Sequence, residues 1–394
     1  MRALYNISIH ILVTAARIFA LFNNKAKLWN KGRKNIFKHL SKAIRDEQNI
    51  VWFHCASLGE FEQGKPIIET YKEKHPKHKI LLTFFSPSGY EIRKNYKGAN
   101  WVFYLPADTK KNAKHFISIV RPIKVIFIKY EFWFNYMSAL KKHNIPFYSV
   151  SAIFRKEQVF FKYKWFAKQL SNVSYFFVQD QSSKVLLQNI GFSNCIVAGN
   201  TCFDSVITNV KNAISIPLIE KFSKNRTTII CGSTWPKDET LLIRYIKDHP
   251  ENNYIIAPHE LQHISVLQKQ TNALLFSKAD NTSIRKSNVL IINNIGILPS
   301  IYQYGKLAYI GGGFGVGIHN ILEAVTFGMP VVFGPNYQKF NEAIELINKK
   351  AAISISNYQE LTSAINDFSA FDKKIAINYI KENGGATNTI LNQL

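Results

Sequence analysis

Short apolar runs that alternate with helical patterns constrain the fold of this chain more than any other feature. In the first half of the chain, helical patterns separate these runs at Leu58–Lys72, Ser86–Asn95, Lys110–Val120 and Phe132–His143. Strands that alternate with helices predict βαβ units and a parallel sheet. The strands expected in this half are Ile50–His54, Lys79–Phe84, Trp101–Leu105, Lys124–Ile128 and Pro146–Val150.

A second set of apolar runs begins near residue 227, after a join at Asp204–Pro217 that has no strong strand pattern. We therefore expect an α/β protein with two Rossmann-like domains facing each other across a cleft, and a chain of 394 residues is long enough for both. Ligands of such sheets bind at the carboxyl ends of the strands. The strands expected in this half are Thr227–Cys231, Asn253–Ala257, Val289–Ile292, Leu307–Ile310 and Pro330–Phe333.

The charge of the chain is strongly positive, with 50 Lys and Arg against 26 Asp and Glu, a formal net charge of +24. Such a field attracts nucleic acid, anionic lipid headgroups or a phosphorylated substrate. No homeodomain, zinc-finger or RNP pattern is present, so nucleic acid is not favoured. The four cysteines, Cys55, Cys195, Cys202 and Cys231, form no CxxC pair, which is typical of a reduced, cytoplasmic protein.

An apolar stretch, Ile7–Phe22, lies near the N-terminus and is interrupted by His10 and Arg17. It has three interpretations: a membrane-spanning helix, a helix that lies in or dips into the bilayer, or an amphipathic helix packed on the first domain. No small-residue cleavage site of a signal peptide follows it. A basic segment comes next, and by the positive-inside rule it places the body of the protein on the cytoplasmic face. Its cations are Lys25, Lys27, Lys31, Arg33, Lys34 and Lys38.

A glycine-rich stretch, Gly311–Gly317, follows the expected strand Leu307–Ile310 and precedes a helix expected to start near Asn320. Glycines let a backbone approach a phosphate closely, and a helix N-terminus offers free N–H groups. The spacing is neither the GxGxxG fingerprint nor a Walker A loop. Glu323 lies one turn after Asn320, where it could accept from ribose hydroxyls or compensate the helix dipole.

Two acids follow expected strands of the first half. Glu60 ends the sequence Ser57-Leu58-Gly59-Glu60, and Glu131 follows the strand Lys124–Ile128. A carboxylate at a strand end could take a proton from an acceptor hydroxyl as a general base. Helix capping is the ordinary explanation of each acid taken alone.

Two further patterns carry no firm assignment. The sequence from His259 to His263 matches the HExxH zinc pattern, but it follows a strand and Pro258, so we interpret the match as coincidence. The segment from Phe154 to Phe166 interleaves basic and aromatic residues, which suits a membrane interface, single-stranded nucleic acid or a plain amphipathic helix.

Taken together, five stretches in order resemble the 3-deoxy-D-manno-octulosonic acid (Kdo) transferases of Gram-negative bacteria. The likeness covers about Asn30 to Asn341. The last stretch is the most specific, with His319-Asn320-Ile321-Leu322-Glu323 followed by Phe327-Gly328-Met329-Pro330. The five stretches are Trp52–Glu60, Glu131–Trp133, Gly199–Asp204, Gly232–Thr234 and Gly311–Pro335.

The resemblance implies the GT-B fold, with a membrane-associating segment at residues 1–29, an acceptor-binding domain at 30–208 and a CMP-sugar-binding domain at 209–394. It implies Glu60 as the catalytic base and Glu131 as a group that stabilises the transition state. The substrate-binding positions implied are Ser57, Gly59, Arg155 and Cys202. The positions implied for CMP are Pro258, His259, Ile295, Gly296, Ile297, Gly312, Gly313, Asn320, Ile321, Leu322 and Glu323.

The chain departs from the family pattern at three places. Cys202 stands where the family usually has Lys, so a cation near the developing phosphate charge is missing. His259 follows Pro258 directly, where the family usually has Pro-Arg-His. Ile295 and Ile297 flank Gly296 in place of Met and Glu, which leaves only backbone contacts there.

The resemblance therefore predicts transfer of Kdo from CMP-Kdo to a lipid A precursor (lipid IVA) in lipopolysaccharide core biosynthesis. The reaction expected is an inverting, metal-independent displacement without a cofactor, at the cytoplasmic face of the inner membrane. Anionic inner-membrane lipids are expected partners, nucleic acid is not, and the oligomeric state stays open. The alternatives are another GT-B sugar-nucleotide enzyme, such as a heptosyltransferase or an epimerase, and a non-catalytic basic protein that binds membranes or nucleic acid.

Overall fold

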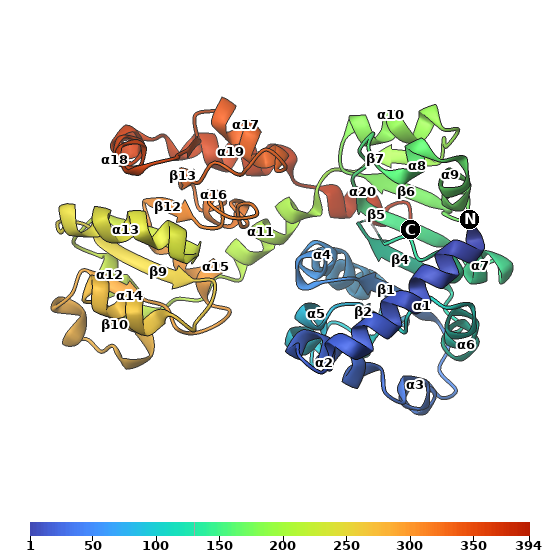
Figure 1. Cartoon of the computed structure of the whole chain (residues 1–394). Helices are drawn as coiled ribbons and strands as arrows, with labels where there is room; N and C mark the ends of the chain where they lie inside the picture. Colours follow the sequence, from blue (N-terminus) through green and yellow to red (C-terminus); the bar gives the residue numbers. More distant parts are fainter. Residues whose placement is uncertain (130) are drawn as a thin grey trace. The chain divides into compact units, whose positions relative to one another are not determined.

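The computed structural model describes residues 1–129 and 131–394, with the side chain of Ser369 also outside the description. The chain forms two compact units (Figure 1). The first unit consists of Met1–Ser205 and Gly384–Leu394, and the second consists of Val206–Asn383. The expected two-part organisation is confirmed.

The first unit is built on a seven-stranded sheet in the order β3-β2-β1-β4-β5-β6-β7, and every strand pair in it is parallel. The five strands expected from the sequence are all present. Two further short strands, β6 and β7, extend the sheet at one edge. The bounds are β1 Ile50–Cys55, β2 Lys79–Phe84, β3 Trp101–Tyr104, β4 Lys124–Ile128, β5 Phe147–Ala152, β6 Tyr175–Val178 and β7 Cys195–Val197.

Helices cover both faces of this sheet, as a parallel sheet requires. Side chains of β1 alternate between two cores: Trp52 packs against Phe116 and Tyr136 on one face, and Phe53 packs against Tyr71 on the other. The helices are α1 Arg2–Phe19, α2 Asn24–Arg33, α3 Ile36–Ala43, α4 Leu58–Lys74, α5 Pro87–Arg93, α6 Lys110–Val120, α7 Phe134–Lys142, α8 Val159–Lys162, α9 Lys164–Leu170, α10 Gln181–Asn189 and α20 Ala386–Leu391.

The second unit contains another parallel sheet of seven strands, in the order β10-β11-β9-β8-β12-β13-β14. The five expected strands are again present, and β10 and β14 are short additional edge strands. The bounds are β8 Thr228–Thr234, β9 Asn253–Pro258, β10 Leu274–Leu275, β11 Val289–Ile291, β12 Leu307–Ile310, β13 Val331–Phe333 and β14 Ala352–Ser354.

The helices of the second unit follow its strands and pack on both faces of the sheet (Figure 1). Helix α11, Thr201–Lys211, begins in the first unit and ends in the second. The others are α12 Pro217–Ser223, α13 Pro236–Asp248, α14 Ile264–Thr271, α15 Leu298–Ile301, α16 Leu322–Val325, α17 Asn341–Asn348, α18 Tyr358–Asp367 and α19 Lys373–Asn383, with 3₁₀ turns at Phe276–Lys278, Ser283–Arg285, Tyr302–Tyr304 and Phe368–Ala370.

Two details differ from the sequence-based expectation. The structural division falls at Ser205, within α11, and the end of the chain returns to the first unit, where Ile390 and Leu391 join the core beneath β1 and β2. The helix expected near Asn320 begins at Leu322 and is only four residues long.

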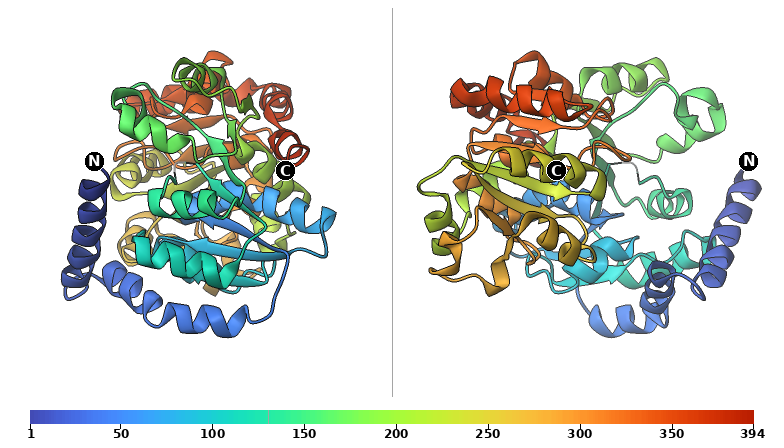
Figure 2. Two further views of the ribbon diagram at one scale, coloured as in Figure 1. Left: turned by 90° about the vertical axis from the view of Figure 1, so that its right-hand side faces the viewer. Right: turned by 60° about the vertical axis from the view of Figure 1, so that its left-hand side comes forward.

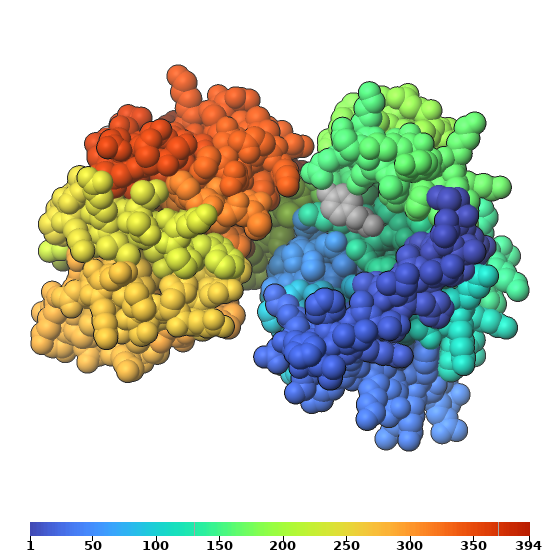
Figure 3. All heavy atoms as spheres, viewed as in Figure 1, coloured from blue at the N-terminus to red at the C-terminus, as the bar shows by residue number. Residues whose placement is uncertain are grey.

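The N-terminal segment folds as two helices, α1 and α2, with a bend of 118° between them. No single helix in the described part of the chain is long and apolar enough to cross a membrane, although this bent pair passes the same test together. Helix α1 lies along the outside of the first unit (Figures 2 and 3). The Tyr5 hydroxyl donates to Asp108 over 2.5 Å, and Ile9 is buried, so one face of α1 is docked on the unit.

Candidate functional site

The carboxyl end of β1 places Glu60 at the edge of the first sheet. Ser57 is the N-cap of α4, so Glu60 is the third residue of the helix. Its carboxylate reaches back to accept from the backbone N–H of Ala56 and of Ser57. This is the capping geometry of an acid at this position, so the ordinary structural role of Glu60 is confirmed.

Capping alone does not account for the electrostatics of Glu60. Burial, and then the charge of Glu131, raise the pKa of its carboxyl to about 8. The backbone N–H donors and the charge of Lys129 act the other way and lower it. A carboxyl whose pKa lies near neutrality can both take and return a proton, which is the property of a general acid–base group.

Glu131 lies after β4, the strand next to β1, and its side chain is only 15% exposed. Its Oε2 lies 3.5 Å from Nε2 of His54, which is fully buried. Nδ1 of His54 lies 2.9 Å from the hydroxyl of Thr83 on β2. Three adjacent strands and the segments that follow them therefore contribute to one group of polar side chains, and the two predicted acids belong to it.

The other positions expected to bind substrate also lie beyond the carboxyl ends of strands in this sheet. Gly59 is exposed, with open space where a side chain would begin. Arg155 follows β5 and is exposed, and its backbone N–H donates to Gln158 over 3.1 Å. Cys202 follows β7 as the second residue of α11, and its N–H donates to the Asn200 side chain.

In the second unit the glycine stretch is shaped by tight backbone packing. A Cβ on Gly311 would lie 2.3 Å from the carbonyl oxygen of Ser233, and a Cβ on Gly313 would lie 2.6 Å from the backbone of Gly334. Gly312 has a φ of +93°, a conformation that favours glycine. The packing of the loop therefore requires these glycines, whether or not the loop binds a ligand.

The buried carboxylate of Asp238 holds this loop in place. It accepts from the backbone N–H of Gly312 over 3.0 Å, from the Tyr309 hydroxyl over 2.9 Å and from the backbone N–H of Trp235 over 2.9 Å. The N–H of Gly312 is thus committed to a protein acceptor. Asp238 ties the loops after β8 and β12 to each other at the carboxyl edge of the second sheet.

Three stacked rings stand at that same edge. His259, after β9, stacks on Trp235 at 4.6 Å and on His319 at 4.4 Å between ring centroids. The indole N–H of Trp235 donates to Nε2 of His319 over 2.9 Å, which places the proton of a neutral His319 on Nδ1. Burial, and then the charge of His259, lower the pKa of His319 to about 4, so this ring is neutral at pH 7.

The remaining nucleotide positions expected from the sequence divide into accessible and buried side chains. Asn320 is exposed, accepts from the Leu322 backbone N–H over 3.1 Å and donates to Glu323 over 3.2 Å. Ile321 and Leu322 are fully buried, so only their backbones could touch a ligand. Ile295 is 84% exposed, and Gly296 beside it has a φ of +96°. Pro258 is buried and Ile297 is half-buried.

The HExxH match does not form a zinc site. His259 to His263 is a loop, because α14 begins at Ile264, and Nε2 of His263 is instead paired with Glu239 over 3.0 Å. Among the residues that the structure describes, no three His, Cys, Asp or Glu side chains gather as metal ligands.

Several residues at these edges had no role in the sequence analysis. His54 and Trp235 lie next to or inside the quoted motifs, but nothing in the sequence said what they would touch. Lys129 and Asp238 lie outside those motifs, and only the folded chain brings Asp238 against Gly312, which is distant in sequence.

Comparison with known proteins gives consistent similarities to one family. Residues 31–205 match the sequence profile of the family described as 3-deoxy-D-manno-octulosonic-acid transferase (kdotransferase). The chain is 25% identical to the 3-deoxy-D-manno-octulosonic acid transferase of Aquifex aeolicus over 85% of this chain and 90% of that protein. It is 28% identical to the enzyme of that name from Chlamydia trachomatis serovar A, over 82% and 79%.

Another relative is longer than this chain. A bifunctional glycosyltransferase/methyltransferase of Fusobacterium nucleatum is 24% identical over 98% of this chain, and the chain spans 64% of that protein's length.

Solved structures with a similar fold include an epimerase and a glycosyltransferase. The UDP-GlcNAc 2-epimerase of Neisseria meningitidis, bound to UDP-GlcNAc, matches 87% of this chain and 98% of its own with a TM-score of 0.61 and 15% identity. A glycosyltransferase of Rickettsia africae matches 88% and 94% with a TM-score of 0.56 and 12% identity. At these identities the likeness shows the fold alone, and it confirms the expected GT-B-like pair of α/β domains.

Proposed function

We propose that this chain, which is similar to Kdo transferases over most of its length, transfers Kdo from CMP-Kdo to a lipid A precursor such as lipid IVA. The family supports Kdo transfer in lipopolysaccharide biosynthesis as the activity. The identity of the donor, the identity of the acceptor and the mechanism are our own proposals.

The observation that carries the proposal is the carboxyl of Glu60, with its pKa near 8 beside a second buried acid. In the reaction, Glu60 takes the proton of the acceptor hydroxyl as its oxygen attacks the anomeric carbon of Kdo. The bond from that carbon to the phosphate oxygen breaks at the same time, and CMP leaves with the electron pair. Attack from the face opposite CMP inverts the anomeric centre.

Glu131 stabilises the positive charge that develops on the sugar ring as CMP departs. Its side chain is only 15% exposed, and its negative charge also acts on the carboxyl of Glu60. His54 positions Glu131, because its Nε2 lies 3.5 Å from Oε2 of the Glu131 carboxylate. The acceptor would enter over Ser57 and Gly59, where the surface is open.

The second unit binds CMP in this proposal. Nδ1 of His319 is a neutral donor that could meet a phosphate oxygen, since Trp235 occupies Nε2. Asn320 and Glu323 offer polar groups for the ribose next to it. The departures from the family pattern at Cys202 and His259 leave fewer cations for the phosphate, and the neutral His319 and backbone N–H groups would take over part of that contact.

The proposal is tested by incubating the purified, membrane-reconstituted chain with CMP-Kdo generated in situ and a bisphosphorylated tetra-acyl lipid A precursor. Mass spectrometry of the lipid should show an increase of one Kdo, and a second increase would mean successive additions. The alternative GT-B activities are distinguished by the donor, because a heptosyltransferase or an epimerase would consume a uridine or adenosine nucleotide sugar and leave CMP-Kdo intact. That result would contradict the proposal.

A further inference from the structure

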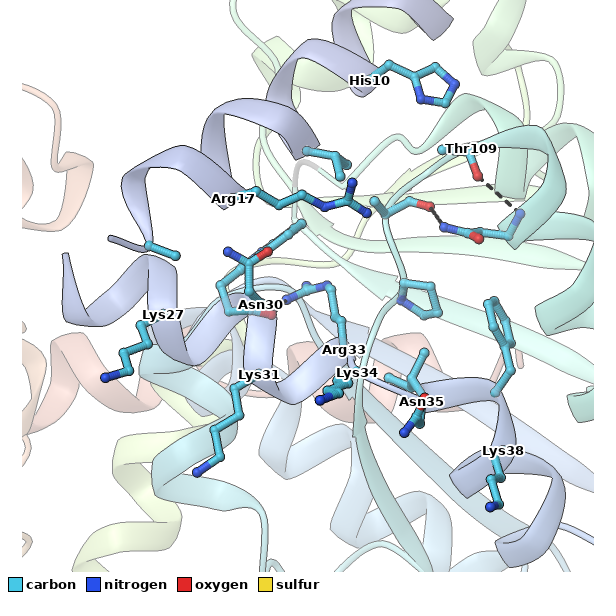
Figure 4. A pocket seen from close by; sticks show the side chains of 18 residues that line it. His10, Arg17, Lys27, Asn30, Lys31, Arg33, Lys34, Asn35, Lys38 and Thr109 are labelled. Carbon is cyan, nitrogen blue, oxygen red and sulfur yellow. Dashed lines mark hydrogen bonds between the residues drawn. The ribbon is translucent and has the colours of Figure 1, made fainter. Parts of the chain in front are cut away.

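The second unit has a basic pocket at the amino edge of its sheet, opposite the carboxyl edge where the expected nucleotide positions lie. The segments that precede β8, β9, β10 and β11 line this pocket, and its volume is about 660 Å³. It is separate from the pocket in Figure 4, which α1, α2 and α3 line in the first unit. The five cationic residues of the pocket in the second unit are Lys221, Lys224, Arg226, Arg285 and Lys286.

The charge of this pocket has no counter-charge within it, because none of its lining residues is acidic. Of the acids that lie next to it in sequence, Asp280 accepts from backbone N–H groups of the turn that follows it, and Glu251 pairs with His249 over 3.1 Å. Glu220 does not line the pocket. Among the residues that the structure describes, none of the five cations forms an ion pair with a carboxylate. Such a cluster attracts an anion from outside the chain.

The helix dipole is the ordinary explanation of a cation near the end of a helix. Lys221 lies in the last turn of α12, and Arg285 ends the 3₁₀ turn Ser283–Arg285. The dipole accounts for each of these cations taken alone. It does not account for the meeting of the two segments at one hollow, where Nζ of Lys221 donates to Oδ1 of Asn281 over 3.0 Å.

Two side-chain amides at the pocket are held in fixed orientations by backbone carbonyl groups. Nδ2 of Asn253, a residue that is only 6% exposed, donates to the carbonyl oxygen of Phe222 over 2.6 Å. Nδ2 of Asn288 donates to the carbonyl oxygen of Asn252 over 3.1 Å. Within the described part of the chain, the Oδ1 atoms of Asn253 and Asn288 accept no hydrogen bond. A hydroxyl group of a ligand can donate to these oxygens.

The size and the chemistry of the pocket fit a small, polar anion. Its volume lies within the range of sites for small molecules. Only Phe222, Pro250 and Ile284 of its lining residues are apolar, so the pocket does not suit an apolar ligand. Arginine pairs with phosphate oxygens through its planar fork, lysine acts on them as a point charge, and the asparagine amides suit hydroxyl groups.

We propose that this pocket binds a small polyol that carries two or more phosphate groups, such as a sugar bisphosphate, at a site separate from the candidate active site. A single-stranded nucleic acid would need exposed rings for its bases, and Phe222, the one ring in the lining, is 5% exposed. A lipid surface would need an apolar side chain to insert, and the lining exposes no large one. The inference does not depend on which sugar the chain transfers.

The pocket is tested with the triple variant Lys224→Gln, Arg285→Gln, Lys286→Gln in the full chain. All three side chains are exposed, so their replacement should leave the fold intact. The charge-preserving variant Lys224→Arg, Arg285→Lys, Lys286→Arg keeps the cations. A matched control removes three exposed lysines of the same unit that do not line the pocket, as Lys350→Gln, Lys374→Gln, Lys381→Gln.

Isothermal titration calorimetry with fructose 1,6-bisphosphate as the probe measures the binding. The wild type should bind the probe saturably at one site, and the pocket variant should bind it about tenfold or more weakly, because hydrogen bonds to charged groups are lost. The control and the charge-preserving variant should bind nearly as well as the wild type. No saturable binding to the wild type, or an equal loss in the control, would overturn the inference.

Competition experiments identify the class of ligand. Inorganic phosphate or citrate that binds as tightly as the bisphosphate would mean a site for any anion, and the assignment to a phosphorylated polyol would be wrong. Displacement of the probe by a short single-stranded RNA, or by vesicles of phosphatidylglycerol, at lower concentration than the probe itself would assign the pocket to nucleic acid or to a lipid headgroup and would also overturn it.

A final measurement separates this inference from the proposed function. Kdo transfer without the probe should be the same in the wild type and in the pocket variant, because the pocket lies at the edge of the sheet opposite the nucleotide positions. A loss of transfer in the pocket variant would mean that the pocket holds the donor or the acceptor, and the inference would be wrong. If no variant transfers Kdo, the proposed function fails, and the calorimetric results still decide the pocket.

Discussion

The carboxyl edges of the two sheets have the same architecture and opposite chemistry. In the first unit, that edge gathers acids, and burial together with mutual repulsion raises the pKa of Glu60 to about 8. In the second unit, the edge carries stacked aromatic rings, and burial, then the charge of His259, lower the pKa of His319 to about 4. Burial opposes charge in both places, so it gives the first unit a group that can exchange protons near neutral pH and the second unit one that cannot.

The difference indicates a division of labour between the units. Proton transfer needs a group that is close to half-ionised, whereas ligand binding by hydrogen bonds and stacking needs groups that keep one protonation state. Each unit also has a buried Asp at this edge, Asp108 in the first and Asp238 in the second, and each of them accepts three hydrogen bonds that fix nearby backbone. The backbone at the two carboxyl edges is therefore held in a similar way, and the two edges differ in the side chains that they carry.

The strongest test of this division is the variant Glu60→Gln, which keeps the shape of the side chain and removes its basicity. Transfer should fall by about 10²- to 10⁴-fold, the usual contribution of a general base, while CMP-Kdo binding stays unchanged. Steady-state kinetics and donor titration measure the two quantities. Glu73→Gln, on the exposed end of α4, is the control, and full turnover in Glu60→Gln would refute the base assignment.

Removing the hydrogen bonds that Asp238 accepts in the second unit should lower the stability of the fold. The variant Asp238→Ala leaves two buried donors and one partly buried donor without their acceptor, and we expect the free energy of unfolding to fall by about 2–4 kcal/mol. Urea denaturation followed by tryptophan fluorescence measures it. Asp367→Ala, an exposed position of the same unit, should change it little. Equal stability in the two variants would show that the loop does not depend on Asp238.

The pH dependence of transfer sharpens the comparison further. A base must be ionised to act, and the pKa of Glu60 is raised to about 8, so kcat/KM should rise with pH and level off above about 8. In the variant Glu131→Gln, one charge that raises this pKa is absent, so the rise should move to lower pH while the rate itself drops. A rise at unchanged pH would mean that Glu131 does not influence Glu60.

The smallest expected effect concerns the ring stack. The variant Trp235→Phe keeps a ring against His259 and removes the indole N–H that holds His319. We expect the KM for the donor to rise about two- to fivefold, the worth of one hydrogen bond, with kcat nearly unchanged. The pH profile should keep its shape, because the pKa of His319 lies at about 4, well below neutral pH. A shifted profile would break the proposed separation of roles between the two units.

Much of the fold was predictable because it depends on local patterns. Lys79–Phe84, Lys124–Ile128 and Leu307–Ile310 are strands with the bounds expected from the sequence. Of the four missed strands, β7, β10 and β14 are edge strands, and β6 lies next to the edge. The strands β7 and β10 are three and two residues long, too short for a period to be detected. The return of α20 to the first unit was missed because nothing in its own sequence says which core Ile390 joins.

The candidate site was predictable to the extent that motifs carry it. Glu60 and Glu131 could be singled out as acids that each follow an expected strand. Their influence on one another could not, because it comes from the pairing of β1 with β4, which are far apart in the chain. The glycine stretch was expected to cradle a phosphate, yet its glycines are also required by backbone contacts with Ser233 and Gly334.

The sequence by itself determined the alternation of strands and helices, the resemblance to the Kdo transferases, the positions of the two acids and the acid-free basic N-terminus. These follow from residue order, since periodicity and charge are properties of the chain before it folds. Only the tertiary structure decided that Glu60 is a half-buried acid with a raised pKa, that Trp235 fixes the tautomer of His319 and that the N-terminal cations line one pocket. Those properties arise from burial and from contacts between distant segments, and neither exists until the chain has packed.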